Sequence, residues 1–484
     1  ASGFDPYSPY GPVYVDGYAV GESPFAPRIQ YDPSLPEEEH VGNWEILEPI
    51  FDVIEKPIDP LGELLGSLLG AEHLETHSEL DSHPIGLQPI PARPELLVEW
   101  GEKFLGPGEL DQGIETPTGA IWRPSFWVFG TYRSALGYRD NRGSQNFTES
   151  ANRLDLFGQL NLSGTERVLV GVRPLDREVG NRRVFSGYDF HDGDSINGFN
   201  SDIQTLFFEG DFGELFPSLD WFDHKQLDYG FSVGRQPLSI QDGLLINEDM
   251  IDALTVTRNT LNGGGNLNLR ATGVLGWDNI NRNNNRPDPD AQLVGLFTES
   301  DFEHYTVNLD AVYVDSPSRF GSLLALGASG VRRFHGFHNT YNSSAHFLTS
   351  IPTEGETAAS GRGTLLFHQL SWTPHHREDL VYVNAFWAID QFTSAARGPL
   401  MGGPLGQAGV LFASPALGQF GAPLSNQASE AYGGSIGYQL LFNSIIDSQV
   451  IVEVGGRKDT NNTNQGALGA ALQYRRKLST HWLM

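Results

Sequence analysis

The chain has no cysteine among its 484 residues, and its basic residues are almost all arginine, with lysine only at 56, 103, 225, 458 and 477. The absence of cysteine excludes a disulfide framework and any thiolate metal site. No apolar run approaches the roughly 18 residues that a membrane-spanning helix needs. The net charge of −29 argues against nucleic acid as a partner.

Motifs of the common enzyme classes are missing as well. The sequence contains no G-x-S-x-G, no H-E-x-x-H and no phosphate-binding loop. A serine–histidine pair brought together only by folding cannot be located from sequence. We therefore expect a protein that is not an enzyme.

What the sequence does contain, from about residue 117 onward, is alternation with a period of two. The clearest example is 266–278, where Leu267, Leu269, Leu275 and Trp277 alternate with polar residues. Similar runs lie at 154–162, 167–173, 229–234, 254–257, 304–313, 381–390, 436–442, 450–457 and 468–474. About fourteen strands can be placed, each near the roughly 9–11 residues that cross a bilayer obliquely.

The connections between these strands are of two kinds. Residues 181–202, 279–299, 335–362 and 394–430 are long, whereas 163–164 and 261–265 are short. Long outer loops with short inner turns are typical of outer-membrane barrels. The pattern predicts an all-β fold, a closed transmembrane antiparallel β-barrel of 16–18 strands over residues 116–484, with Leu267, Leu269 and Leu275 facing lipid.

The first 115 residues differ in composition. They hold 23 acidic and 4 basic residues, and prolines are dense. Apolar residues between 46 and 69 fall near helical spacing, but Pro49, Pro57 and Pro60 interrupt them, so only short helices are expected. We expect a periplasmic extension that either packs on the barrel or binds another envelope protein.

The stretch 226–260 resembles the alginate-export family of outer-membrane barrels. The resemblance rests on an ordered set: Gly234-Arg235-Gln236, then Gln241-Asp242-Gly243, then Asp252-Ala253. It extends over roughly 152–257, and over later strands only in pattern. It implies an outer-membrane protein surrounded by lipid and lipopolysaccharide that passes acidic sugars. Strict alternation places Arg235 on the apolar face with Val233, so a bulge or the membrane boundary must accommodate it.

Charged residues on the polar faces of the strands are the candidate pore lining. They are Arg153, Asp155, Arg167, Arg173, Glu209, Asp211, Arg258, Arg270, Glu453 and Arg457. A guanidinium group holds carboxylates in a bidentate manner and keeps its charge, which suits a path for anions. The alternative is that arginine–acid pairs only brace the lumen.

These observations predict an outer-membrane porin or exporter that gives small solutes or anionic saccharides passive passage through an arginine-lined lumen. Two alternatives stay open. The protein is a structural outer-membrane anchor that docks an envelope complex through residues 1–115, or it is a soluble polysaccharide-binding β-protein. Ala1 is compatible with a mature N-terminus. The final Trp482-Leu483-Met484 lacks the terminal aromatic residue that usually closes such barrels, so either closure is atypical or Met484 is not the end.

No cofactor is predicted, and metal ligands are few. His73 and His77 have a workable helical spacing, and His335, His338, His375 and His376 lie in predicted loops. Oxygen ligands for Ca²⁺ in outer loops are available at two places. These are Asp192 and Asp194 with Asn197 and Asp202, and Asp288 with Asp290.

Overall fold

A computed structural model describes most of the chain beyond the acidic extension. The described residues are 93, 95–106, 110–140, 147–180, 182–220, 227–261, 265–336, 339–374, 379–415, 417–418, 420–442, 448–461, 465–479 and 481–484. The short helices expected at 46–69, and the residues His73, His77, His338, His375 and His376, lie outside the described residues.

The regular secondary structure of the described chain is almost entirely strand. The first strands are β1 (Val98–Trp100), β2 (Ile114–Glu115), β3 (Ile121–Trp122), β4 (Ser125–Arg139), β5 (Phe147–Asn161), β6 (Arg167–Val172), β7 (Asp176–Val179), β8 (Arg182–Asp189), β9 (Asp194–Ile196) and β10 (Ile203–Asp211). The central ones are β11 (Tyr229–Ile240), β12 (Ile246–Leu261), β13 (Asn268–Asp278), β14 (Gln292–Asp301), β15 (Tyr305–Asp315), β16 (Leu323–Gly336) and β17 (Asn339–Pro352). The last are β18 (Gly363–Trp372), β19 (Leu380–Gln391), β20 (Ala396–Arg397), β21 (Ser429–Phe442), β22 (Ser448–Asp459), β23 (Gly466–Ser479) and β24 (Trp482–Leu483). The short helices are α2 (Phe212–Leu215), η1 (Pro217–Asp220) and η2 (Pro404–Gln407).

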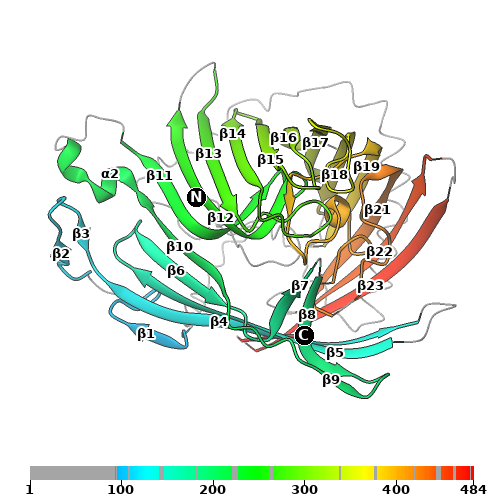
Figure 1. Ribbon diagram of the computed structural model, residues 1–484, viewed down its shortest axis with the longest axis horizontal. Helices are drawn as coiled ribbons and strands as arrows, with labels where there is room; N and C mark the ends of the chain where they lie inside the picture. The colour runs from blue at the N-terminus through cyan, green and yellow to red at the C-terminus, as the bar shows by residue number, and fades with distance from the viewer. Residues whose placement is uncertain are drawn as a thin grey trace, which may run out of the picture.

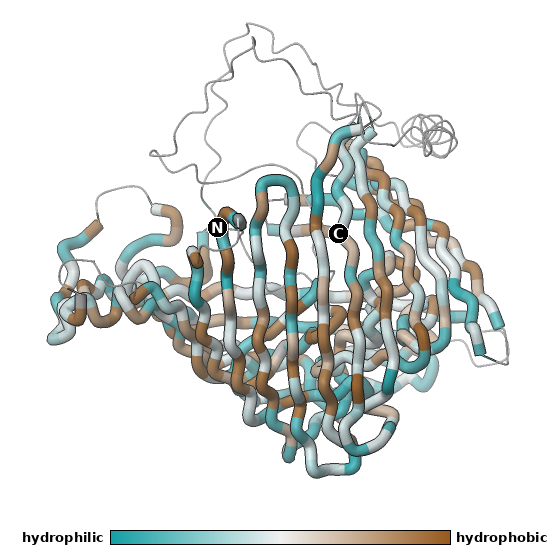
Figure 2. Tube along the Cα trace, turned by 90° about the horizontal axis from the view of Figure 1, so that it is seen from above, coloured by the Kyte–Doolittle hydropathy of each residue, from teal (hydrophilic) through white to brown (hydrophobic). Residues whose placement is uncertain are grey.

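The strands form one large curved antiparallel sheet (Figures 1 and 2). Among the described strands, sixteen follow one another as neighbours: β4 to β6, β10 to β19, and β21 to β23. The predicted all-β, antiparallel fold class is confirmed. Among the described residues, no backbone hydrogen-bonded pairing joins β23 to β4. The closure of the barrel therefore stays a prediction.

Short strands add to both edges of this sheet. β1 pairs with β4, where Trp100 lies opposite Phe126, and β24 pairs with the end of β23. Strand pairing therefore begins before the predicted boundary at residue 116. The chain between β6 and β10 makes an excursion in which β8 pairs with β5 and with β7.

Each strand of the central sheet has two different faces. On one face Leu275, Val294 and Leu309 are 51, 53 and 59% exposed, whereas Val274, Leu293 and Val312, on the other face of the same strands, are 1% exposed. This follows from the period-two geometry of a strand. Figure 2 shows hydrophobic and hydrophilic residues alternating along strands that lie side by side. Leu267 is also exposed. Arg270 lies on the same face of β13 as the buried Val274, which is the inner face.

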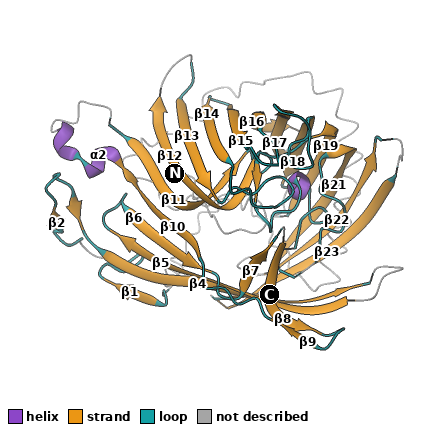
Figure 3. Cartoon of the chain, in the orientation of Figure 1, coloured by secondary structure: helices purple, strands orange, loops and turns teal. Residues whose placement is uncertain are grey.

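The inner face is covered by loops that enter the space inside the curved sheet. The described residues between 392 and 428, which include η2, connect β19 to β21 and lie on the concave side of the curved sheet (Figures 1 and 3). Their Phe392, Leu405 and Phe412 are fully buried and join the same apolar core as Leu348 of β17 and Leu365 of β18. The long connection predicted at 394–430 therefore fills part of the interior.

Another predicted long connection was wrong. Residues 335–362 were expected to form a long loop, but most of them belong to β16 and β17. The reason is that Asn342, Ser343 and Ser344 are polar on both faces of β17, so this strand shows little alternation. Likewise, β8 occupies much of the predicted loop 181–202, and β14 begins at Gln292 within the predicted loop 279–299.

Because Phe412 of the interior loop is fully buried, truncating its side chain is expected to destabilise the protein strongly. Phe412→Ala is expected to lower the free energy of unfolding by about 3–5 kcal/mol, because a buried aromatic side chain leaves a cavity. Urea unfolding in detergent micelles measures this change. Phe347→Ala is the control, because Phe347 is 52% exposed on the outer face and leaves no cavity. Equal costs for the two variants would contradict a packed interior loop.

Candidate functional site

The stretch 226–260 forms the hairpin β11–β12, and Gly234 is its point of closest approach to the next strand. Its φ is +123°, and a Cβ atom there would lie 2.3 Å from the carbonyl oxygen of Leu206 on β10. Only glycine tolerates both conditions. Gly234 is thus explained by backbone packing between β10 and β11.

Arg235 lies on the outer face, as alternation predicted, and the neighbouring strand neutralises it. Asp252 is directly opposite on β12, and its carboxylate accepts from Arg235 Nε at 2.9 Å and from Nη2 at 3.1 Å. The expected irregularity is present one residue later, where the β11–β12 register shifts between Gln236 and Leu238. The Arg and Asp of the motif therefore form an ion pair on the outside of the sheet.

The turn that follows β11 points into the interior. Gln241, Asp242 and Gly243 have φ values of +55°, +53° and +75°. Gln241 Nε2 donates to Asp310 Oδ2 at 2.6 Å, and His346 Nδ1 donates to Gln241 Oε1 at 2.8 Å. Strands β15 and β17 therefore hold this turn in place from the inner face.

The turn at residues 241–243 also holds the interior loop that connects β19 to β21. β20 runs parallel to the start of β12, with Ala396 opposite Ile246. The guanidinium of Arg397 donates to Ser394 Oγ at 3.2 Å and to the carbonyl oxygens of Gly243 and Met401. Burial lowers the pKa of Arg397 to about 9, which leaves it charged at neutral pH.

A second anchor lies on the opposite side of the loop. Glu453 of β22 is fully buried, and its carboxylate accepts from the backbone N–H groups of Val410 and Leu411, each at 2.8 Å. The hydroxyl of Tyr382 also donates to it. Glu453 lies on the inner face of its strand, as predicted. Its carboxylate accepts hydrogen bonds from the loop and from Tyr382, and so it holds the loop in place.

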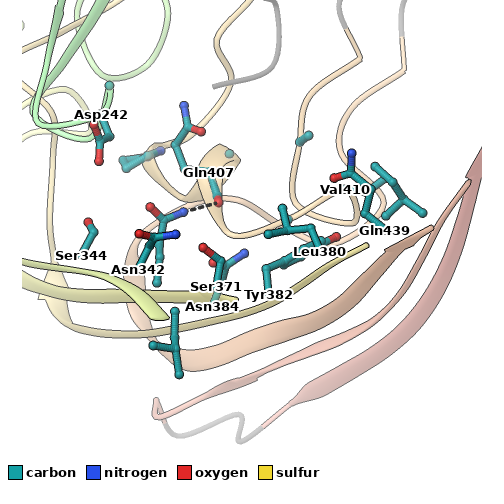
Figure 4. A pocket seen from close by; sticks show the side chains of 18 of the residues that line it. Asp242, Asn342, Ser344, Ser371, Leu380, Tyr382, Asn384, Gln407, Val410 and Gln439 are labelled. Atoms are coloured by element: carbon teal, nitrogen blue, oxygen red, sulfur yellow. Dashed lines mark hydrogen bonds between the residues drawn. The ribbon is translucent and has the colours of Figure 1, made fainter. Parts of the chain in front are cut away.

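Beneath the loop lies a cavity of about 340 Å³ (Figure 4). One side is the loop itself, with Gln407 and Val410, and the other is the inner face of β17 to β23. Gln369 Nε2 donates to the carbonyl oxygen of Gln407 at 3.4 Å across one side of it.

The strand wall of this cavity consists of two polar rows. In the first, Ser344, Gln369 and Asn384 lie directly opposite one another on β17, β18 and β19. In the second, Asn342, Ser371 and Tyr382 are paired in the same way. Directly opposite residues in a sheet have Cβ atoms roughly 4.5–5.5 Å apart, so each row is a continuous strip of hydrogen-bonding groups.

A second, larger cavity of about 830 Å³ lies along the inner face of β4 to β6 and β10 to β12. Gln159 and Asn161 line it, as does the ion pair between Arg167 and Glu209. Three of the predicted pore residues, Arg167, Glu209 and Asp211, therefore do line open space, and the first two form a compensated pair.

Three other predicted pore residues are brought together on the inner face near the β7–β8 hairpin. The carboxylate of Asp155 contacts the guanidinium groups of Arg153 and Arg173, each at 2.9 Å, and of Arg133 at 2.8 Å. Arg153, Asp155 and Arg173 are all at least nine-tenths buried. In this arrangement the arginines brace one another through a shared acid.

The remaining predicted pore residues also have partners. Arg258 lies over the ring of Tyr229, Arg270 is 3.3 Å from Glu299, and Arg457 is 3.0 Å from Asp459. Asp211 accepts from the N–H groups of Gly213 and Glu214 and so caps α2. Their assignment to a conducting path stays a prediction.

Sequence reasoning missed the polar rows of the cavity wall. The available signal was an uncharged polar residue at every second position near one end of three successive strands: Asn342 and Ser344, Gln369 and Ser371, Asn384. The sequence analysis looked for apolar residues at every second position, and so it did not detect polar residues with the same spacing.

The described residues do not gather metal ligands. No group of three or more His, Asp or Glu side chains suited to a metal ion is found among them. Asp288, one of the predicted calcium ligands, instead contacts the fully buried Arg282 at 3.0 Å and accepts from Ser316 Oγ at 2.7 Å. His335 is bonded to Thr340.

Comparison with known proteins gives distant likenesses in structure only. No protein-family model matches the chain, and no curated protein sequence matches it. Pseudomonas aeruginosa OccK2 (OpdF) is 9% identical, with 74% of this chain and 88% of that one covered at a TM-score of 0.48. A BenF-like porin from Pseudomonas fluorescens Pf-5 is 9% identical, with 72% and 87% covered at 0.47. An anion-selective porin from Comamonas acidovorans is 11% identical, with 73% and 95% covered at 0.38.

These likenesses leave the chain without an assigned family. The resemblance to alginate exporters stays a prediction. Within the described residues, no helix has the length and apolar character needed to cross a membrane.

The anchor at Glu453 predicts how the loop responds to its loss. Glu453→Ala leaves two buried N–H groups without an acceptor, at a cost of about 1–3 kcal/mol each. Amide hydrogen exchange at Val410 and Leu411 should become faster accordingly. Glu299→Ala is the control, because Glu299 is partly exposed and paired with Arg270. Unchanged protection at Val410 and Leu411 would contradict the anchoring role.

Proposed function

We propose that the protein is a porin of the Gram-negative outer membrane that gives small hydrophilic solutes passive passage. One observation carries the proposal: the same strands expose apolar side chains on the outside and carry polar side chains around cavities on the inside. Water-soluble antiparallel sheets normally show the opposite arrangement, with the apolar face buried and the polar face in solvent. The outer face therefore meets lipid, which is the arrangement of a transmembrane barrel.

The number and direction of the strands support this proposal. Sixteen consecutive antiparallel strands are an even number, so the last strand runs antiparallel to the first and can pair with it. Closure removes the sheet edges, which hydrocarbon cannot satisfy by hydrogen bonding. A barrel of this size encloses a lumen wide enough for water and solutes where loops do not fill it.

The finer prediction was an arginine-lined path for anionic saccharides. The ion pairs of these arginines limit the positive field that such a path would have. Arg167 and Arg270 face Glu209 and Glu299, so each positive charge is compensated locally. Exposed pairs of this kind produce a weak net field on a passing ion. We therefore propose a mild anion preference at most, with size and hydrogen bonding as the main selectivity.

Conductance tests passage and selectivity together. The full chain, purified in detergent and inserted into planar bilayers, should give ohmic single-channel steps. In a salt gradient the reversal potential should correspond to a permeability ratio close to unity, shifted slightly toward anions and reduced by Arg270→Ala. Absence of steps would contradict passage. A clear cation preference that Arg270→Ala leaves unchanged would remove the anion path.

The lipid-facing assignment predicts the effect of a charge in the middle of β15. Leu309→Arg should destabilise the membrane-inserted protein by about 2–4 kcal/mol, the cost of a cation near the bilayer midplane. Leu309→Phe is the control and should be nearly neutral. Unfolding by urea in phospholipid vesicles measures both. A negligible cost for Leu309→Arg would show that this face meets water.

A further inference from the structure

The cavity beneath the interior loop is lined by two rows of uncharged polar side chains on β17 to β19, and we propose that it binds a neutral polyhydroxylated solute, such as a short oligosaccharide. This inference rests on the proposed passage of hydrophilic solutes and specifies the class of solute that is recognised. It departs from the acidic sugars that the family resemblance implied.

The key group is Asn384 on β19. Its side chain is 6% exposed, lines the cavity, and has no hydrogen-bond partner in the described part of the chain. The amide faces the open space of the cavity, where a solute that supplies both a donor and an acceptor can bond to it.

Asn342 and Ser371 extend this unpaired surface. They lie opposite one another in the second row, line the same cavity, and have no side-chain hydrogen bond to any described residue. Figure 4 shows Asn342, Ser371 and Asn384 on the wall that faces Gln407 of the loop. The spacing of strands, roughly 4.8 Å, sets the distance between successive polar groups along a row.

The chemistry of these groups selects hydroxyls over carboxylates. An amide carries two donors and an acceptor, and a serine hydroxyl is both donor and acceptor. A sugar hydroxyl can satisfy both kinds of group, whereas an ionised carboxylate only accepts and leaves the amide oxygens without a donor. Leu380, Val410 and Ile451 also line the cavity and offer apolar surface to the C–H faces of a sugar ring.

The charged groups that line the cavity do not provide a carboxylate site on this wall. Arg397 donates to backbone carbonyls, and Asp242 Oδ2 lies 3.1 Å from His346 Nε2. Arg332 and Arg333 are exposed on β16 and Arg475 lies on β23, on either side of the strands that carry the two rows. An exposed guanidinium is screened by water and salt.

Equilibrium binding tests the inference independently of conductance. The full chain in detergent micelles is titrated with a neutral linear trisaccharide of glucose and with a trisaccharide of uronate, by saturation-transfer NMR. We expect the neutral sugar to bind more tightly. Asn384→Ala and Asn342→Ala should each weaken its binding by about twofold to tenfold, the value of one hydrogen bond.

Asn308→Ala is the matched control. Asn308 is an amide on the inner face of β15, bonded to Ser329 and outside this cavity. Its truncation should leave sugar binding unchanged. Tighter binding of the uronate, abolished by Arg333→Gln, would overturn the inference, as would neutral-sugar binding that the two asparagine variants do not weaken. Sugar binding without conductance would refute passive passage but leave this site standing. Conductance without sugar binding would refute this site but leave passive passage standing.

Discussion

A loop inside a barrel must find a partner for each backbone polar group that it removes from water. Residues 392–428 meet this constraint with a few side chains that reach in from the wall. Glu453 accepts from two of the N–H groups, Ser435 Oγ donates to the carbonyl oxygen of Ala408 at 2.5 Å, and Arg397 donates back to the β11–β12 turn. Without them, each orphaned group would cost roughly as much as a lost hydrogen bond. The position of the cavity depends on these contacts, because the loop forms one of its sides.

The β11–β12 hairpin connects the outside of the sheet to this interior. Gly234 allows close approach to β10, and Arg235 with Asp252 forms an ion pair on the outer face. The turn at Asp242 and Gly243 then seats Arg397 and lines the cavity. The motif that resembles alginate exporters is therefore explained largely by architecture. Only its Asp242 and Gly243 reach the space where a solute would lie.

Sequence reasoning recovered what depends on alternation. Strands such as β13 and β15 were predicted because an apolar residue at every second position marks one outer, exposed face, while the residues between them face the interior. β17 was missed because Ser343 is polar on the outer face while Asn342 and Ser344 are polar on the inner face. The inner-face parity of Glu453 was correct. Its burial was not predictable, because it depends on a loop some 40 residues earlier in the sequence that folds back over it.

The same limit applies to charge. From sequence, arginines on polar strand faces indicated an anion path, because parity says where a side chain points but not what it meets there. In the structure, Arg153 and Arg173 converge on Asp155, and Arg270 meets Glu299. On the two strand rows of the cavity wall, the groups without a side-chain partner among the described residues are amides and a hydroxyl, whereas the arginines of the cavity lie beside these rows. Charges that compensate each other create little field, whereas an unpaired buried amide keeps its full demand for a partner. Selection in this lumen is therefore expected to act through hydrogen bonding at short range more than through long-range charge.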